Sequence, residues 1–461
     1  MGRLSQALLW AGGLVVALLM AYTLLLDLGL GRPLTGNPAP TSHELTVGVF
    51  YPELVLWHEL RQGIRLCSDK GLLTVVEEAE RSITVRLTQT GRRLRFVLRD
   101  VRGVHEMTVE LRQLVSSPAP PLAVIGSSNT VLTAALARAL RAQSTASGPL
   151  LLVPWASTVQ MAPGAAGEGP VSLLEILPDR TFRFCLNNQY QADLVVDSLL
   201  REKKARPPRR VMVVKDRLDP YSVDLANCFH RAVERVVPSA EFIERSDPLV
   251  LPLPGELSTL PTAPEEAVAD SIWRQVESLP EGESTWLFLP LQEEPARRLL
   301  VALRGRSRVR PTGTDGPLQL ICGDALSMPT LVQLAGRVPF RVSSVSSMTM
   351  QMPARGVSPD ALVPAEIVAA LVAVLDREGA GTPTSESLRE ALAALRLGPA
   401  SSGALGRSLA FSRAGERIGD DLGMVLSIRP DSHEVYWAVR NPAGTWMPAE
   451  PVPAEILAAW P

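Results

Sequence analysis

A strand–helix–strand pattern occupies residues 122–158, which read LAVIGSSNTVLTAALARALRAQSTASGPLLLVPWAST. The apolar runs Leu122–Ile125 and Leu150–Val153 have the length of strands, and Val131–Ala142 between them has the length and spacing of a helix. A continuously apolar run is typical of a strand that is covered on both faces, as in a parallel sheet. The stretch therefore predicts a βαβ unit with two parallel strands.

The same alternation of strand and helix continues along most of the chain. Further strands are expected at Leu45–Phe50, Arg95–Leu98, Val211–Val214, Trp286–Leu289 and Leu318–Ile321. Helices are expected at Trp57–Cys67, Met107–Val115, Gln191–Leu200, Ser222–Val236, Glu265–Ser278, Ala296–Leu303, Pro364–Arg377 and Ser387–Leu395. Met424–Ile428 and Glu434–Arg440 are predicted to pair as a hairpin. Two such series in succession indicate an α/β protein of two lobes with parallel sheets.

Composition excludes several classes of protein. The 461 residues carry a formal net charge of −2, so no strong electrostatic field attracts nucleic acid, and no nucleic-acid partner is expected. The four cysteines are too scattered for a dense disulfide scaffold or a CxxC site: Cys67, Cys185, Cys228 and Cys322. One or two disulfides remain open in an oxidising compartment, and the sequence does not pair them.

The segment Ala7–Leu26 is uncharged, mostly apolar and long enough to span a bilayer as a helix. We expect an uncleaved single-pass membrane anchor, because Asp27 and the residues after it form a poor cleavage site; a cleaved signal peptide and a buried core helix are the alternatives. Arg3 favours a body in the periplasm or extracellular space. Residues 1–30 are assigned to the anchor and residues 31–43 to a linker.

Motifs of enzymes are not found in the sequence. It contains no GxSxG elbow, no phosphate-binding GxxxxGK[ST], no HExxH and no GxGxxG after a strand. A hydrolase that used Ser127 or Ser157 would need a base that no motif supplies. The histidines are isolated from cysteines and carboxylates at ligand spacing. The sequence therefore predicts a protein that is not an enzyme, with no catalytic residue, cofactor or metal site.

Small polar residues follow two of the predicted strands. Ser127-Ser128-Asn129 comes after one strand, and Ala156-Ser157-Thr158 comes after the next. Ligands of open parallel sheets bind beyond the carboxyl ends of the strands, where helix N-termini suit a carboxylate. These segments are therefore candidate binding residues, and capping of helices is the other interpretation.

Seven segments follow the order and spacing of one known family: LTVGVFY (Leu45–Tyr51), RFVLRDV (Arg95–Val101), AVIGSSNT (Ala123–Thr130), PLLLVPWAST (Pro149–Thr158), FRFCLNNQYQA (Phe182–Ala192), VMVVKDRLDPYSVDLANCF (Val211–Phe229) and GALGRSLAFSRAGER (Gly403–Arg417). Together they resemble the type I periplasmic binding proteins, in particular the branched-chain amino acid (Leu/Ile/Val) receptors. The resemblance implies two Rossmann-like α/β lobes, joined by a hinge, that close on a small ligand.

The resemblance also implies which residues bind the ligand. In lobe one, Ser127 or its neighbour Ser128, together with Ala156 and Ser157, would hold the ligand carboxylate. Trp155 stands beside them where the family has a small residue.

In lobe two, Tyr221 matches the tyrosine that folds over the ligand in the family, and Asp324 matches an acidic residue that grips the ligand ammonium. Gln292 lies in the loop where the family often has an aromatic or small residue, and it is a further candidate for a ligand contact. By the family's three crossings, lobe one would take residues 44–187 and 346–420, and lobe two would take 188–345 and 421–461.

The resemblance implies an extracytoplasmic solute-binding receptor of an ABC-type transporter, with a small polar ligand such as an amino acid and a separate permease as partner. A membrane-anchored ligand sensor, or a structural module with a changed or vestigial pocket, is the alternative. Trp155 and the anchor favour that alternative.

Overall fold

The computed structural model describes residues 44–453 apart from 53, 102, 144–147, 162–170, 202–206, 248–263, 281, 307–317, 347–358, 378–382, 399–407, 420–422, 431 and 441–444. The predicted anchor at Ala7–Leu26 and the predicted linker at 31–43 lie outside the described residues. Within the described ranges, no helix is both long and apolar enough to cross a bilayer.

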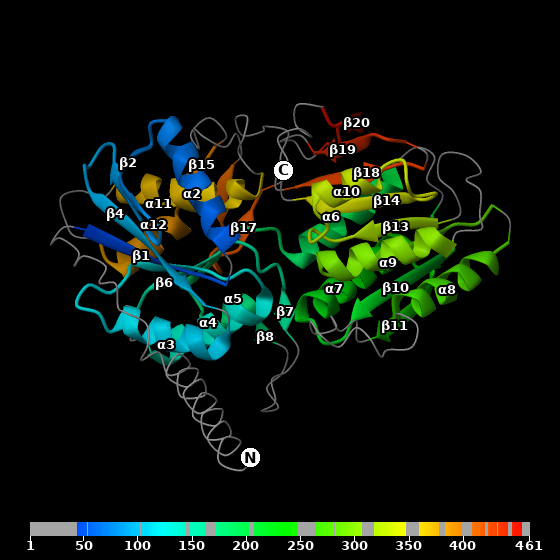
Figure 1. The fold of residues 1–461 in the computed structure, drawn as a ribbon, viewed down its shortest axis with the longest axis horizontal. Coiled ribbons are helices and arrows are strands. Elements are labelled where there is room, and N and C mark those ends of the chain that lie inside the picture. Colours follow the sequence, from blue (N-terminus) through cyan, green and yellow to red (C-terminus); the bar gives the residue numbers. More distant parts are fainter. Residues whose placement is uncertain are drawn as a thin grey trace, which may run out of the picture. The chain divides into compact units, whose positions relative to one another are not determined.

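The first large sheet has seven strands in the order β2-β3-β4-β1-β5-β6-β9 (Figure 1). Its strands are β1 (Glu44–Tyr51), β2 (Leu73–Ala79), β3 (Ser82–Leu87), β4 (Arg93–Asp100), β5 (Ala123–Gly126), β6 (Leu150–Val153) and β9 (Thr181–Arg183). Strands β1, β5, β6 and β9 run parallel, whereas β2, β3 and β4 are joined antiparallel. The predicted βαβ unit is confirmed as β5, α4 (Thr130–Gln143) and β6.

Helices cover both faces of the first sheet. Successive residues of a strand point to opposite sides, so a continuously apolar strand has apolar side chains on both faces that the helices bury. Val47, Val49 and Tyr51 of β1 pack on one face of the sheet. Phe50, which lies between Val49 and Tyr51 in the sequence, packs on the other face. The first face is covered by α2 (Leu54–Asp69), α11 (Leu362–Leu375) and α12 (Ser385–Ala393). The second face is covered by α3 (Val104–Val115), α4 and α5 (Leu173–Ile176).

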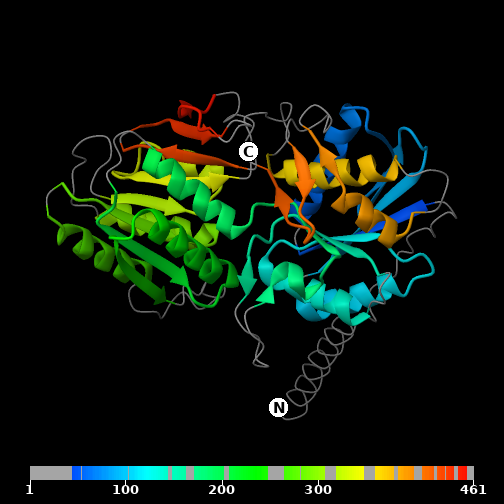
Figure 2. The same ribbon diagram turned by 180° about the vertical axis from the view of Figure 1, so that it is seen from behind.

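The second large sheet has eight strands in the order β11-β10-β12-β13-β14-β18-β19-β20. They are β10 (Arg210–Asp216), β11 (Glu241–Asp247), β12 (Thr285–Leu289), β13 (Leu318–Cys322), β14 (Arg341–Ser346), β18 (Met424–Ile428), β19 (Val435–Val439) and β20 (Glu450–Pro451). The strands from β10 to β14 are parallel, and β18 to β20 extend the sheet antiparallel. Figure 2 shows these red C-terminal strands continuing the yellow and green ones. The predicted hairpin is thus confirmed.

The second sheet is also buried on both faces. Val211 and Val213 of β10 face α6 (Asn188–Arg201) and α7 (Pro220–Val236). Met212 and Val214 face the other layer, which consists of α8 (Pro264–Glu277), α9 (Glu293–Arg306) and α10 (Met328–Leu334). This two-sided cover explains why the central strands are continuously apolar.

Short elements complete the fold. They are β7 (Gln160–Met161), β8 (Val171–Ser172), β15 (Arg396–Leu397), β16 (Leu409–Phe411), β17 (Arg417–Ile418) and a 3-10 turn, η1 (Pro359–Ala361). The chain passes from the first sheet to the second after β9, returns after β14, and passes to the second sheet again between β17 and β18. Segments distant in the sequence therefore meet at the junction of the two sheets.

The expectation of parallel sheets needs a correction, because both sheets are mixed. The β2–β3 hairpin was not predicted, since β2 is an edge strand whose residues after Leu73 are mostly exposed and which ends in Glu-Glu-Ala. Strand β14 was also missed, because its sequence RVSSVS contains no continuous apolar run. The pairing of β2 and β14 depends on the neighbouring strands more than on their own amino-acid composition.

All four cysteines lie in the described part of the chain, are buried and form no disulfide. Burial raises the pKa of the Cys67 and Cys228 thiols to about 12, and it raises the pKa values of the other two thiols as well. We expect iodoacetamide to label none of the four in the native protein and all four after unfolding, because alkylation needs an accessible thiolate. Mass spectrometry of intact protein measures the labelling, and fast native modification would contradict this burial.

Candidate functional site

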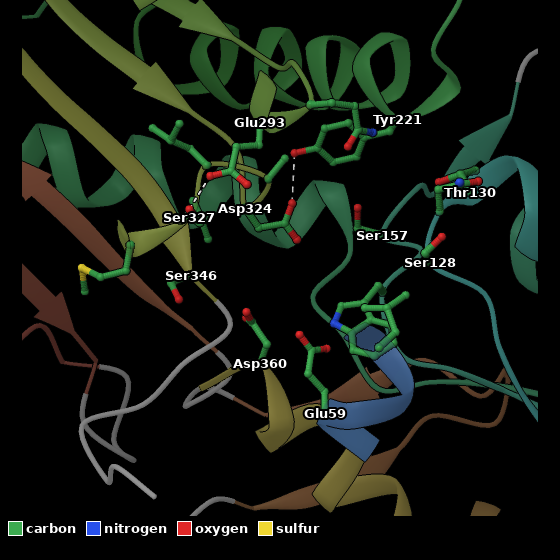
Figure 3. A pocket seen from close by; sticks show the side chains of 18 of the residues that line it. Glu59, Ser128, Thr130, Ser157, Tyr221, Glu293, Asp324, Ser327, Ser346 and Asp360 are labelled. Carbon is green, nitrogen blue, oxygen red and sulfur yellow. Dashed lines mark hydrogen bonds between the residues drawn. The ribbon is translucent and has the colours of Figure 1, made fainter. Parts of the chain in front are cut away.

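A cavity of about 300 Å³ lies at the carboxyl ends of strands from both sheets (Figure 3). From the first sheet, Ser128 follows β5 and Ser157 follows β6. From the second sheet, Gln292 follows β12 and Asp324 follows β13. A cavity of this size is at the lower end of the range that small-molecule sites occupy, roughly 300–1,000 Å³.

The loop after β5 caps a helix and also lines the cavity. Asn129 caps α4, since its Oδ1 accepts a hydrogen bond from the Leu132 N–H at 3.0 Å. The Thr130 and Thr158 hydroxyl groups are hydrogen bonded at 2.7 Å, which joins this loop to the one after β6. Ser128, Asn129 and Thr130 all line the cavity. Capping therefore positions the loop and leaves Ser128 at the cavity wall.

Ser157 and Trp155 form the next part of this wall. Ser157 is only 2% exposed and lines the cavity, and its backbone carbonyl accepts hydrogen bonds from the Asn188 N–H at 2.8 Å and from Arg183 Nη1 at 3.3 Å. Trp155 is half-buried, and its ring centroid lies 5.5 Å from that of Tyr51. The indole thus lines the cavity without filling it.

Tyr221 and Asp324 form the opposite wall and contact each other. Asp219 caps α7 and Pro220 begins it, which places Tyr221 in the first turn. The Tyr221 hydroxyl donates to Asp324 Oδ1 at 3.0 Å, and the Asp324 N–H donates to Gln191 Oε1 at 3.1 Å. Burial raises the pKa of the Asp324 carboxyl from 3.8 to about 6, although the hydrogen bonds from Tyr221 and Gln191 oppose this shift.

The raised pKa of Asp324 predicts a pH dependence of stability. Between pH 3.8 and about 6, folded Asp324 retains a proton that the unfolded chain has lost. Its contribution to the free energy of unfolding must therefore increase as the pH falls through this window, and ionisation above it is destabilising. Urea unfolding of wild type and Asp324→Asn at several pH values isolates this contribution. We expect the wild type to gain stability relative to the variant on acidification; a constant difference would contradict the shift.

Glu293, which the sequence did not single out, adds a second carboxylate to the wall formed by the second sheet. Its Oε1 accepts hydrogen bonds from the hydroxyl groups of Ser327 and Thr330. The neighbouring Gln292 is exposed at the rim, and its Nε2 donates to Asp219 Oδ2 at 3.0 Å. Glu293 also follows β12, so its position after a parallel strand was the signal that could have identified it.

Two further carboxylates reach the cavity from distant parts of the chain. Glu59 comes from α2 and Asp360 from η1. Figure 3 shows them across the cavity from Glu293 and Asp324. Part of Asp360 is exposed, yet desolvation of its carboxyl raises its pKa, and the charge of Glu293 adds to the shift. No strand-end pattern marks either residue, so sequence reasoning could not place them here.

The structure brings most of the predicted binding residues together. Ser128, Ser157, Tyr221, Gln292 and Asp324 all line the same cavity. Their ligand-binding roles remain predictions.

Ser127 and Ala156 are buried but do not line this cavity. The Ser127 N–H donates to the Thr133 hydroxyl at 3.0 Å, which is a contact within its own loop and helix. Any direct contact of these two residues with a ligand likewise remains a prediction.

Comparison with known proteins rests on structure. No protein-family model matches the sequence, and no curated protein matches it either. An ABC transporter substrate-binding protein from Desulfitobacterium hafniense, in complex with Leu, is 14% identical, with 85% of this chain and 99% of that chain covered and a TM-score of 0.59. A leucine binding protein from Thermotoga maritima is 14% identical, with 87% of this chain and 100% of that chain covered and a TM-score of 0.57. The chain has the type I periplasmic binding fold.

The type I periplasmic binding fold carries different ligands in its solved examples. A solute binding protein of an ABC transporter from Rhodopseudomonas palustris, in complex with p-hydroxybenzoic acid, is 12% identical, with 89% of this chain and 98% of that chain covered and a TM-score of 0.56. Leucine and an aromatic acid thus occupy proteins of the same fold. The fold alone therefore does not identify the ligand of this chain.

Proposed function

We propose that this chain is an extracytoplasmic solute-binding receptor of an ABC-type transporter, and not an enzyme. One observation carries the proposal: polar side chains from strand ends of both sheets line a single cavity, with Ser157 on one wall and Tyr221 and Asp324 on the other. A ligand with a donor or cation for Asp324 and an acceptor for Ser157 would contact both walls. A small polar molecule such as an amino acid has these groups.

The two walls belong to the two proposed lobes, residues 44–187 with 346–420 and residues 188–345 with 421–461. Asp224 of α7 supports a hinge next to the cavity. It accepts hydrogen bonds from the Val159 and Gln160 N–H groups at 2.7 and 3.1 Å and from Asn188 Nδ2 at 2.8 Å. These bonds tie the segment after β6 to a helix of the second sheet. Closure about such a contact would turn ligand binding into a surface that a permease recognises.

The segment Ala7–Leu26 supports a membrane location for this receptor. Its length and lack of charge suit an uncleaved single-pass anchor, with the body in the periplasm or extracellular space. An anchored receptor would present its ligand close to a membrane permease. An anchored sensor would have the same location but a partner other than a permease. Reconstitution with candidate permeases separates the two roles, because only a transport receptor would deliver its ligand to one of them.

The alternative of a sensor or structural module with a changed or vestigial pocket rested on Trp155 and on the anchor. Because the indole lines the cavity and leaves about 300 Å³ beside it, the cavity favours a protein that still binds a ligand.

Thermal unfolding of the full chain against a panel of amino acids and other small polar metabolites tests the proposal. A ligand at about 100 times its Kd adds roughly 2.7 kcal/mol to stability, so at least one compound should raise Tm. The rise should shrink in Ser157→Ala and persist in Ser198→Ala, since Ser198 is buried in α6 away from the cavity. A panel without any rise, or equal rises in both variants, would overturn the proposal.

A further inference from the structure

Four carboxylates without a cationic partner lie near the C-terminal ends of strands in the second sheet. Glu293 and Asp324 line the cavity, Asp216 ends β10, and Asp219 caps α7. In the described parts of the chain, none of these four carboxylates forms an ion pair with a Lys, Arg or His. Their recorded partners are hydroxyl groups, an amide and backbone N–H groups. A wall of this kind attracts positive charge.

The two cavity carboxylates of the wall formed by the second sheet, Glu293 and Asp324, occupy different positions. Asp324 is held by Tyr221 and Gln191, whereas Glu293 is held by Ser327 and Thr330. In each carboxylate, one oxygen accepts the hydrogen bonds from these hydroxyl groups. The other oxygen can accept hydrogen bonds from further donors. Figure 3 shows both on the same side of the cavity, at separate points. They therefore provide two separate positions for cationic groups.

The wall formed by the first sheet independently suits a polar ligand. Ser157 is 2% exposed, lines the cavity, and uses its backbone carbonyl for the hydrogen bonds from Asn188 N–H and Arg183, so its hydroxyl is available at the cavity wall. A hydroxyl group at a cavity wall can donate to or accept from a polar ligand group, so Ser157 suits a ligand that is polar on this side. Trp155 and Tyr221 add aromatic surface that interacts favourably with organic cations.

The cavity suits an organic cation better than a metal ion. Within the described residues, no group of three or more His, Cys, Asp or Glu side chains is arranged to hold a metal. A cavity of about 300 Å³ with two aromatic side chains is also far larger than one ion requires.

We propose that the ligand is a small organic molecule with two cationic nitrogen groups, one paired with Asp324 and the other with Glu293. This inference rests on the proposed function as a solute receptor and specifies its ligand class. A neutral amino acid has one ammonium group and would leave the Glu293 carboxylate desolvated without a counter-charge, which is costly. Basic amino acids and diamines satisfy both positions, and they differ in whether they also offer a carboxylate toward Ser157.

Calorimetric titration of the full chain tests the ligand class with defined probes. The probes are L-lysine and L-arginine for basic amino acids, butane-1,4-diamine for diamines, L-leucine for neutral amino acids and L-glutamate for acidic ones. We expect at least one dicationic probe to bind about tenfold or more tightly than leucine, and glutamate to bind most weakly. Tighter binding of lysine or arginine than of the diamine would assign a role to the ligand carboxylate; the reverse would assign the site to diamines.

Glu293→Gln tests the second position, because glutamine keeps an acceptor for Ser327 and Thr330 but removes the charge. Binding of the dicationic probe should weaken about tenfold or more. The matched control is Glu294→Gln, whose wild-type side chain pairs with Arg297 at the surface and does not line the cavity.

The outcomes of this titration separate the ligand class from the proposed function. Leucine binding as tight as that of every dicationic probe, and unchanged in Glu293→Gln, would overturn the ligand class and leave the receptor function in place. Absence of binding by every probe and by the wider metabolite panel would overturn both.

Discussion

Replacing Glu366 by alanine is expected to lower the free energy of unfolding by about 3–5 kcal/mol, the loss typical of a broken buried ion pair. Glu366 of α11 pairs with Arg417 of β17, and both side chains are 2% exposed. Arg417 also donates to the Phe184 carbonyl at 3.0 Å, at the start of the segment that leaves the first sheet. The substitution would leave a buried guanidinium without its counter-charge at the junction between the sheets.

Urea unfolding of the full chain measures this effect. Glu386→Ala is the matched control, because Glu386 pairs with Arg389 on the exposed side of α12 and such pairs contribute about 1 kcal/mol or less. Equal losses in the two variants would show that the buried pair does not stabilise the junction.

Asp324→Asn is expected to weaken ligand binding about 30-fold or more, equivalent to about 2 kcal/mol or more for loss of a buried charge partner. Asparagine retains an oxygen that can accept from Tyr221, so the wall should keep its shape. Calorimetric titration gives the affinity, and circular dichroism checks the fold.

Asp270→Asn serves as the control for this loss of charge. Asp270 of α8 pairs with Arg306 of α9 and does not line the cavity, so its replacement should leave the affinity unchanged. Undiminished binding by Asp324→Asn would remove Asp324 from the site.

The sequence predicted most of the fold because the central strands are apolar on both faces. Val211–Val214 and Leu150–Val153 could be recognised alone, since burial between helix layers requires this composition. The β2–β3 hairpin and β14 could not, because edge exposure and serines remove that signal. Their pairing is defined by neighbouring strands.

The candidate site was predictable only in part for a similar reason. Ser157 and Asp324 follow strands of parallel sheets, where ligand sites form, and their positions can be inferred from local sequence. Glu59 and Asp360 reach the cavity from α2 and η1, which are separated by most of the chain. Only the packing of α11 and η1 against α2 brings them together, and local sequence does not report such packing.

The structure of the full chain with a bound ligand tests the central claim most directly. A compound that raises Tm would be co-crystallised, and difference density would locate it. The account predicts density in the cavity between Ser157 and Asp324, with a cationic nitrogen of the ligand within hydrogen-bond distance of the Asp324 carboxylate. Density for the compound elsewhere, with this cavity holding only water, would contradict it.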